Sequence, residues 1–136
     1  MFLHRKGAAP SDEGLVVIPG SRGAYSYLVS SINSDQHHAS GFSLAHGAGR
    51  AVPRSKTNKI KEKFSKKAGN QQELSELLLA TSFNSAVICE DNALLVEEHQ
   101  DAYKSIDAVV GDLVEFGLIK IVARFRPLLT YKTRNE

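Results

Sequence analysis

The sequence predicts an α+β fold, and three observations support this prediction. Short apolar segments bounded by Gly and Pro are typical of strands. Longer charged segments with apolar residues three or four positions apart are typical of amphipathic helices. Both kinds of segment are mixed along the 136 residues, 42% of which are hydrophobic, without repeats or low-complexity sequence. The length is that of a single segment, residues 1–136, and nothing in it marks a domain boundary.

The first part of the chain is expected to hold strands and glycine loops. Residues 14–19, GLVVIP, predict a short strand that ends at a proline and a glycine, and residues 24–30, AYSYLVS, predict a second. The polar segment 31–41 is expected to be a surface connection. Residues 41–50, GFSLAHGAGR, then lead from apolar residues into a glycine loop.

The second part of the chain is expected to hold most of the helices. Ile60 and Phe64, four residues apart, give a narrow apolar stripe to a charged segment. Farther on, apolar residues gather on one helical face, and Gly117 follows in the position of a C′ residue. Helices are therefore predicted at 55–68, 71–80 and 101–117, a short buried strand at 85–89, and a closing strand at 118–131 that stops at Pro127.

Charge is distributed unevenly, although the formal net charge is only +2. Residues 50–67, the basic segment, hold eight Lys or Arg and one acid, whereas residues 71–116 hold ten acids and one cation, Lys104. A basic segment suits a polyanion such as RNA, because neutralising phosphates releases counterions. The alternative is a solvated basic helix face with no partner.

Several classes of protein are excluded by composition. The longest apolar run is far shorter than the roughly 20 residues that cross a bilayer, and the N-terminus places charge where a signal peptide needs an apolar stretch. We therefore expect a cytoplasmic protein. Cys89 is the only cysteine, which rules out an internal disulfide and a cysteine-rich zinc site.

Two glycine loops, residues 19–23 (PGSRG) and 46–50 (HGAGR), could approach a phosphate. Glycine lacks a Cβ, so backbone N–H groups can reach anionic oxygens, and Arg22 and Arg50 add positive charge. Neither loop matches the Walker or dinucleotide patterns, and both could be plain turns.

His46 is the candidate nucleophile of the second loop. An imidazole can attack phosphorus and form a covalent phosphoramidate, provided that nearby donors stabilise the developing charge. The HGAGR segment supplies a histidine and glycine backbone together. The alternative is a packed or capping histidine.

Six segments of this sequence resemble, in the same order, the C-terminal part of the RtcB family of RNA-splicing ligases. The resemblance covers nearly the whole chain. With Arg22 in place of a methionine, it looks most like the branch coupled to release factor H. The matching segments are HRKGA (4–8), VIPGSRGAYSYLV (17–29), SLAHGAGR (43–50), RSK (54–56), AYKSID (102–107) and GLIKIVARFRPLLTYK (117–132).

The resemblance implies a GTP-dependent RNA ligase. Members of the family join an RNA 3′-phosphate or 2′,3′-cyclic phosphate to a 5′-hydroxyl with GTP and manganese, through a histidine–GMP intermediate, in tRNA splicing or RNA repair. By resemblance, His46 is the nucleophile and Lys132 closes the nucleotide pocket, while the departure at Arg22 leaves that contact open. The nucleotide contacts carried over are Pro19, Gly20, Ser21, Arg22, Ser26, His46, Gly47, Ala48, Gly49 and Lys132.

The manganese ligands of the family lie N-terminal to HRKGA and have no counterpart here, and Cys89 does not match the metal-binding cysteine. We therefore expect an incomplete domain that does not ligate RNA alone and exposes surface, making it poorly soluble or dimeric. Its partners would be RNA and a separately encoded N-terminal half or an activating protein. The alternatives are an inactive nucleotide- or RNA-binding remnant and a plain structural domain whose loops are turns.

Overall fold

A computed structural model describes residues 4–134 and confirms the α+β class. The strands and helices of the described chain are β1 (Ala8–Pro10), β2 (Leu15–Ile18), β3 (Ser26–Ser31), α1 (Asp35–Ala39), β4 (Ser43–Ala45), η1 (Arg54–Lys56), α2 (Asn58–Ser65), α3 (Gln71–Leu79), β5 (Ala86–Cys89), α4 (Asn92–Glu97), η2 (Gln100–Ala102), α5 (Ile106–Glu115), β6 (Ile119–Phe125) and β7 (Leu129–Lys132).

The chain forms two units that alternate along the sequence. Unit 1 comprises the residues up to Gly20 together with 25–48 and 105–125, and unit 2 comprises 21–24, 49–104 and the residues from 126 onward. The chain therefore passes from one unit to the other at five points, after residues 20, 24, 48, 104 and 125.

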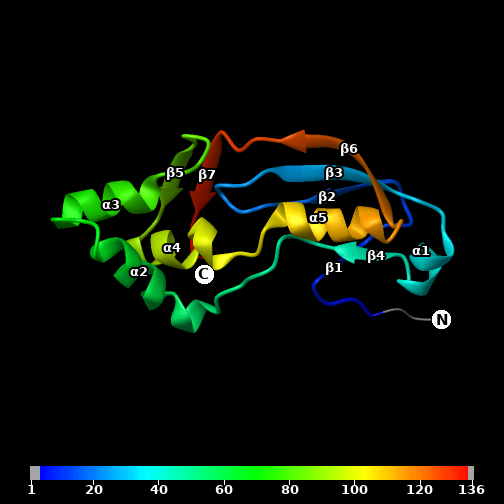
Figure 1. The fold of residues 1–136 in the computed structure, drawn as a ribbon, viewed down its shortest axis with the longest axis horizontal. Coiled ribbons are helices and arrows are strands. Elements are labelled where there is room, and N and C mark those ends of the chain that lie inside the picture. Colours follow the sequence, from blue (N-terminus) through cyan, green and yellow to red (C-terminus); the bar gives the residue numbers. More distant parts are fainter. Residues whose placement is uncertain (1–3, 135–136) are drawn as a thin grey trace. The chain divides into compact units, whose positions relative to one another are not determined.

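Unit 1 is built on an antiparallel sheet in the order β2-β3-β6, with α5 along one face (Figure 1). The hydroxyl of Tyr27 on β3 donates to Asp107 of α5 at 2.7 Å, which fixes the helix to that face. Strand β1 pairs antiparallel with β4 in a second, two-stranded sheet. The buried apolar side chains of the sheet and helix are Val16, Ile18, Tyr27, Val29, Ile106, Val110 and Ile119.

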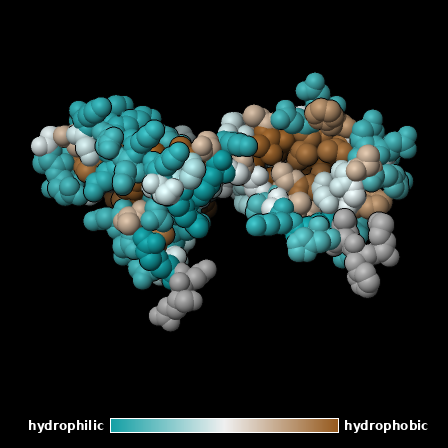
Figure 2. Space-filling view, turned by 90° about the horizontal axis from the view of Figure 1, so that it is seen from below, coloured by the Kyte–Doolittle hydropathy of each residue, from teal (hydrophilic) through white to brown (hydrophobic). Residues whose placement is uncertain are grey.

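The opposite face of the three-stranded sheet is apolar but exposed. Val17 pairs with Leu28, and Leu28 pairs with Ala123, so these three residues form one row across the strands. Leu15 and Phe125 flank the row, and Leu15, Val17 and Phe125 are 59%, 55% and 51% exposed. We call these five residues the outer sheet face. Figure 2 shows hydrophobic residues gathered on one face of unit 1.

Unit 2 is built from helices around a small apolar core. Helices α2, α3 and α4 bury Ile60, Leu74, Leu78, Leu95 and Val96 together. Strands β5 and β7 form a parallel pair in the same unit. Because a core of this size stabilises little, polar contacts inside unit 2 are expected to contribute much of its stability.

Several elements differ from the sequence-based expectation. The polar segment 31–41 contains helix α1, whose N-cap Ser34 accepts a hydrogen bond from the His37 N–H. Helix α4 was not expected and begins after Asp91, which caps it in the same way. The proline at 127 separates β6 from a further strand, β7, instead of ending the sheet structure. Strand β5 is not buried, since Ile88 is 50% exposed.

Strands β1 and β4 were not predicted either, and helix α5 begins at Ile106, later than the predicted start at residue 101. The other helices and strands agree with the sequence. Helix α5 ends at the expected glycine, because Gly117 has φ +67°, a conformation that suits a C′ residue. Within the described residues, none of the helices is both long and apolar enough to span a membrane.

Candidate functional site

The loop that carries His46 leaves strand β4 of unit 1. His46 follows directly after Ala45, and its side chain is exposed rather than packed among aliphatic residues. A Cβ on Gly47 would lie 3.3 Å from the carbonyl oxygen of Pro19, so glycine permits this close approach. The Ala48 N–H donates to the same oxygen at 3.2 Å. The backbone that follows His46 is thereby held against the Pro19 loop.

The loop that contains Pro19 leaves strand β2 and is held from its other side by Ser26. The Gly20 N–H donates to the Ser26 hydroxyl oxygen at 3.2 Å. Ser26 is the first residue of β3, which is paired with β2. Unit 1 thus brings together six of the ten predicted nucleotide contacts: Pro19, Gly20, Ser26, His46, Gly47 and Ala48.

The other four, Ser21, Arg22, Gly49 and Lys132, belong to unit 2. Arg22 is only 5% exposed, and its guanidinium donates to the carbonyl oxygens of Leu78 at 2.6 Å and Leu95 at 3.0 Å. Those carbonyls belong to helices α3 and α4, so the Arg22 side chain serves as an internal clamp. Burial lowers the pKa of Arg22. If Arg22 contacts a nucleotide, its backbone rather than its side chain must therefore make the contact.

Arg50, the last residue of the HGAGR loop, binds a buried carboxylate in unit 2. Its guanidinium donates to Glu98 Oε1 at 2.5 Å and to the carbonyl oxygen of Glu97 at 2.8 Å. Arg54 lies 3.4 Å from the same carboxylate, and the Tyr103 hydroxyl donates to its other oxygen. Glu98 is only 7% exposed.

The charges around Glu98 set the pKa values of this cluster. Burial alone would raise the pKa of Glu98, but the Tyr103 hydrogen bond and the charges of Arg50, Lys132 and Arg54 outweigh it and lower the pKa. Burial, together with the hydrogen bond to the carboxylate, raises the pKa of Tyr103 to about 12. Glu98 is thus ionised and Tyr103 is protonated at neutral pH.

Lys132 is the final residue of β7, next to Cys89 of β5 in the parallel pair. Its Nζ lies 3.9 Å from Glu98 Oε2, and its side chain is 46% exposed. Sequence reasoning singled out Lys132 and Arg50 but missed Glu98, which joins them. Glu98 carries no sequence signal beyond being one of two adjacent acids in an unassigned segment.

Three other histidines, His37, His38 and His99, have hydrogen-bond partners within the protein. Buried His37 shares a 2.7 Å hydrogen bond with the Ser11 hydroxyl, and His38 contacts Asn33. His99, 1% exposed, accepts from the Asp101 N–H through Nδ1. Between residues 4 and 134, no group of three His, Cys, Asp or Glu side chains could hold a metal ion. Burial raises the pKa of the Cys89 thiol, which disfavours the metal-binding thiolate.

Comparison with known proteins gives matches over almost the whole chain. The family model described as tRNA-splicing ligase RtcB matches residues 1–133. RNA-splicing ligase RtcB2 of Escherichia coli is 48% identical over 132 residues, which cover 96% of this chain and 32% of that protein. The tRNA-splicing ligase RtcB of Nanoarchaeum equitans is 37% identical over 117 residues, covering 86% of this chain and 22% of that protein.

The chain thus spans a third or less of the length of these relatives. The match nevertheless extends along almost all of its own length and includes both glycine loops. The chain belongs to the RtcB family of tRNA-splicing ligases.

Proposed function

We propose that this chain supplies the guanylate-accepting histidine of a GTP-dependent RNA ligase, which joins an RNA 3′-phosphate or 2′,3′-cyclic phosphate to a 5′-hydroxyl. The observation that carries the proposal is the position of His46. Its imidazole is exposed, and the backbone that follows it is fixed against the Pro19 loop by the Ala48–Pro19 hydrogen bond of 3.2 Å. An exposed ring on a fixed backbone is what nucleophilic attack on a bound phosphate requires.

The predicted contact residues of unit 1 have distinct roles in this proposal. A ring nitrogen of His46 attacks the α-phosphorus of GTP, so that an N–P bond forms while the bond to the departing pyrophosphate breaks. Pro19 and Ser26 fix the two loops through their contacts to Ala48 and Gly20, and Gly47 permits the close approach of the His46 loop to the Pro19 carbonyl oxygen. Ser21, Arg22, Gly49 and Lys132 remain predicted contacts that rest on the resemblance.

The described residues do not provide a set of side chains that could bind manganese. Residues 4–134 hold no group of three metal-binding side chains, so the ion that the resemblance implies does not fit them. We therefore derive no step through a metal held by this chain. Ligation is proposed to require the remaining part of an RtcB ligase as a partner, with RNA ends on the basic segment and a cytoplasmic location.

The proposal is tested by incubating the purified chain with GTP and manganese, alone and with the remaining part of a related ligase, and measuring intact mass. We expect a GMP adduct that maps to the His46 peptide and is lost in His46→Ala. His38→Ala is a matched control, because His38 is also an exposed histidine of unit 1. An adduct that persists in His46→Ala would show that another residue is the nucleophile.

The absence of a metal-binding group in the described residues also favours a second candidate function. In that case the chain is a remnant that binds nucleotide or RNA without forming an adduct. RNA binding with no adduct, even when the remaining part of the ligase is supplied, would support the remnant. If neither RNA binding nor a GMP adduct is observed, the chain would be a structural domain without either function.

A further inference from the structure

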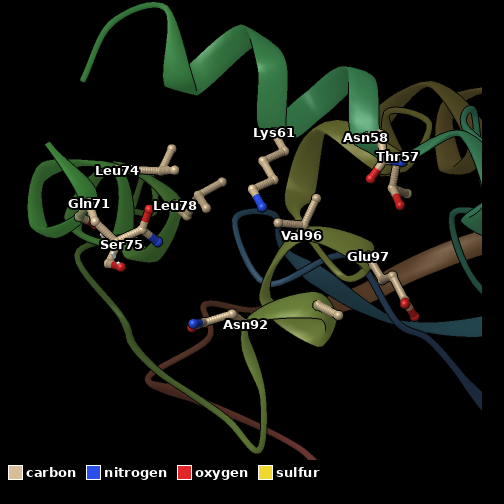
Figure 3. A pocket seen from close by; sticks show the side chains of 11 residues that line it. Thr57, Asn58, Lys61, Gln71, Leu74, Ser75, Leu78, Asn92, Val96 and Glu97 are labelled. Atoms are coloured by element: carbon tan, nitrogen blue, oxygen red, sulfur yellow. Dashed lines mark hydrogen bonds between the residues drawn. The ribbon is translucent and has the colours of Figure 1, made fainter. Parts of the chain in front are cut away.

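A cavity of about 220 Å³ opens between helices α2, α3 and α4 of unit 2. None of the ten predicted nucleotide contacts lines it. Leu74 and Leu78 of α3 and Val96 of α4 form an apolar floor, and each is buried. Figure 3 shows Leu74 and Leu78 projecting from α3 toward the space beneath α2. The floor is therefore suited to the face of a flat, weakly polar group.

The rim of this cavity carries carboxamides from all three helices. Asn58 lies on α2, Gln71 on α3 and Asn92 on α4, and all three residues are exposed. A carboxamide offers an acceptor oxygen and two donor hydrogens, so it can match the mixed donors and acceptors on the edge of a nucleobase. Carboxylates alone only accept hydrogen bonds and lysines alone only donate them, so neither could match both the donors and the acceptors of a base.

Lys61 places one positive charge over the cavity. Its side chain extends from α2 toward Val96 (Figure 3). Between residues 4 and 134 it forms no ion pair, whereas its neighbour Lys63 pairs with Asp101 at 2.5 Å. Glu97 is the acidic residue of the lining, and its carboxylate lies 3.4 Å from Arg134. The charge left unbalanced at the cavity is positive, which favours an anionic ligand.

Size and chemistry together narrow the class of ligand. The volume is below the range of about 300–1,000 Å³ that holds drug-sized molecules, so one ring system fits and a peptide helix does not. A divalent cation is disfavoured, because the single lining carboxylate is already paired with Arg134. A ring with a polar edge and an attached phosphate meets all three features of the cavity.

We propose that this cavity binds one unpaired nucleotide of the RNA, with its base on the apolar floor and its phosphate at Lys61. The inference rests on the proposed function, since an RNA ligase must hold single-stranded ends. It also goes further, because it assigns a base-binding subsite to unit 2. The basic segment, which includes α2, supplies cations for the neighbouring phosphates.

The test measures binding of a six-nucleotide single-stranded RNA of mixed sequence to the full chain by fluorescence anisotropy at several salt concentrations. Ser75→Phe fills the cavity and is expected to weaken binding about tenfold while leaving the salt dependence unchanged. Gln72→Phe is the matched control, because it adds the same ring on α3 outside the cavity and should bind like the wild type.

A second pair of variants separates the subsite from general charge. Lys61→Gln is expected to weaken binding about threefold more than Lys59→Gln, which removes the same charge from α2 outside the cavity. Asn92→Ala removes an amide without adding bulk and should weaken binding about threefold. RNA that contains 4-thiouridine should cross-link to peptides from α3 or α4.

The inference is overturned if the wild type binds no RNA, if Ser75→Phe and Asn92→Ala both bind normally, or if the two lysine variants are equivalent. Cross-links confined to unit 1 would also overturn it. The GMP adduct is measured on the same preparations. Failure of the adduct with an intact RNA effect would remove the proposed catalytic role and leave the subsite standing, and the reverse result would remove only the subsite.

Discussion

The two units of this protein leave different kinds of surface open. Unit 1 exposes an apolar sheet face on which Leu15, Val17 and Phe125 are each more than half exposed. Unit 2 exposes the lysines of α2, one of which, Lys61, lines a cavity with an amide rim. On the face drawn in Figure 2, unit 1 carries a hydrophobic area and unit 2 is mainly hydrophilic. Exposed apolar faces are typical of protein–protein contacts, whereas basic polar surfaces are typical of nucleic-acid binding.

The units also differ in what stabilises them. Unit 1 has a sheet and a helix that bury aliphatic side chains. Unit 2 has buried polar groups, namely His99, Glu98 and Arg22, whose partners lie on its helices and loops. Buried polar groups stabilise a fold only while they are paired or neutral. Changes to these groups should therefore unfold unit 2 and spare unit 1.

The largest expected effect is the loss of stability of unit 2 on acidification. Burial and the charge of Arg22 lower the pKa of His99 from 6.5 to about 4. Between those values the unfolded chain takes up a proton that the folded chain does not, so stability is full above pH 6.5 and falls toward pH 4. The expected loss is about 3 kcal/mol. Urea unfolding across this pH range, with hydrogen exchange to locate the change, measures it.

Two histidine variants serve as controls for that pH dependence. His99→Phe should flatten it, and His38→Phe should leave it intact, because His38 is exposed. An equal loss of protection in unit 1 would remove the distinction between the units.

A slightly smaller effect is expected for Glu98→Gln. The neutral amide leaves Arg50, Arg54 and Lys132 without the carboxylate that balances them. The partial exposure of the cations reduces the expected cost to about 2–3 kcal/mol of unfolding free energy. Glu97→Gln is the matched control, with an expected cost below about 1 kcal/mol, and equal costs for both variants would contradict the role of Glu98.

Arg22→Met should cost about 2 kcal/mol, because it removes the donors to the Leu78 and Leu95 carbonyls while keeping similar bulk. Amide exchange should rise in α3 and α4 more than in β2 or β3. If the variant is as stable as the wild type, the clamp contributes nothing.

The smallest change in folding stability is expected at the outer sheet face. Val17→Ser and Phe125→Ser alter exposed side chains and should shift the unfolding free energy by less than about 0.5 kcal/mol. They should, however, reduce self-association measured by sedimentation. Unchanged association would show that this face does not mediate it, and Leu79→Ser, at an exposed leucine of unit 2, is the control.

Local signals in the sequence predicted the elements that depend on neighbouring residues. The short apolar run GLVVIP, ended by a proline and a glycine, predicted β2, and Gly117 predicted the end of α5. Helix α1 was missed because its polar residues hide a single buried side chain, His37. Strand β7 was missed because its partner β5 lies more than 40 residues earlier in the chain, and such pairing leaves no local pattern.

The candidate site was predictable to a similar extent. The HGAGR and PGSRG motifs identified the residues of the two loops, but their spacing does not show that Ala48 binds Pro19. Tertiary packing, which the motifs do not encode, turns the Arg22 side chain inward. It also brings Arg50 and Lys132 close to the Glu98 carboxylate. Motif content therefore predicted candidate residues, while their orientation required the fold.

The repeated passage of the backbone between the two units has a consequence for limited proteolysis. All five crossings fall inside segments that resemble the RtcB family: after residues 20 and 24 in VIPGSRGAYSYLV, after 48 in SLAHGAGR, after 104 in AYKSID and after 125 in GLIKIVARFRPLLTYK. Each unit is built from three separate stretches of the chain, so no single proteolytic cut can release either unit intact.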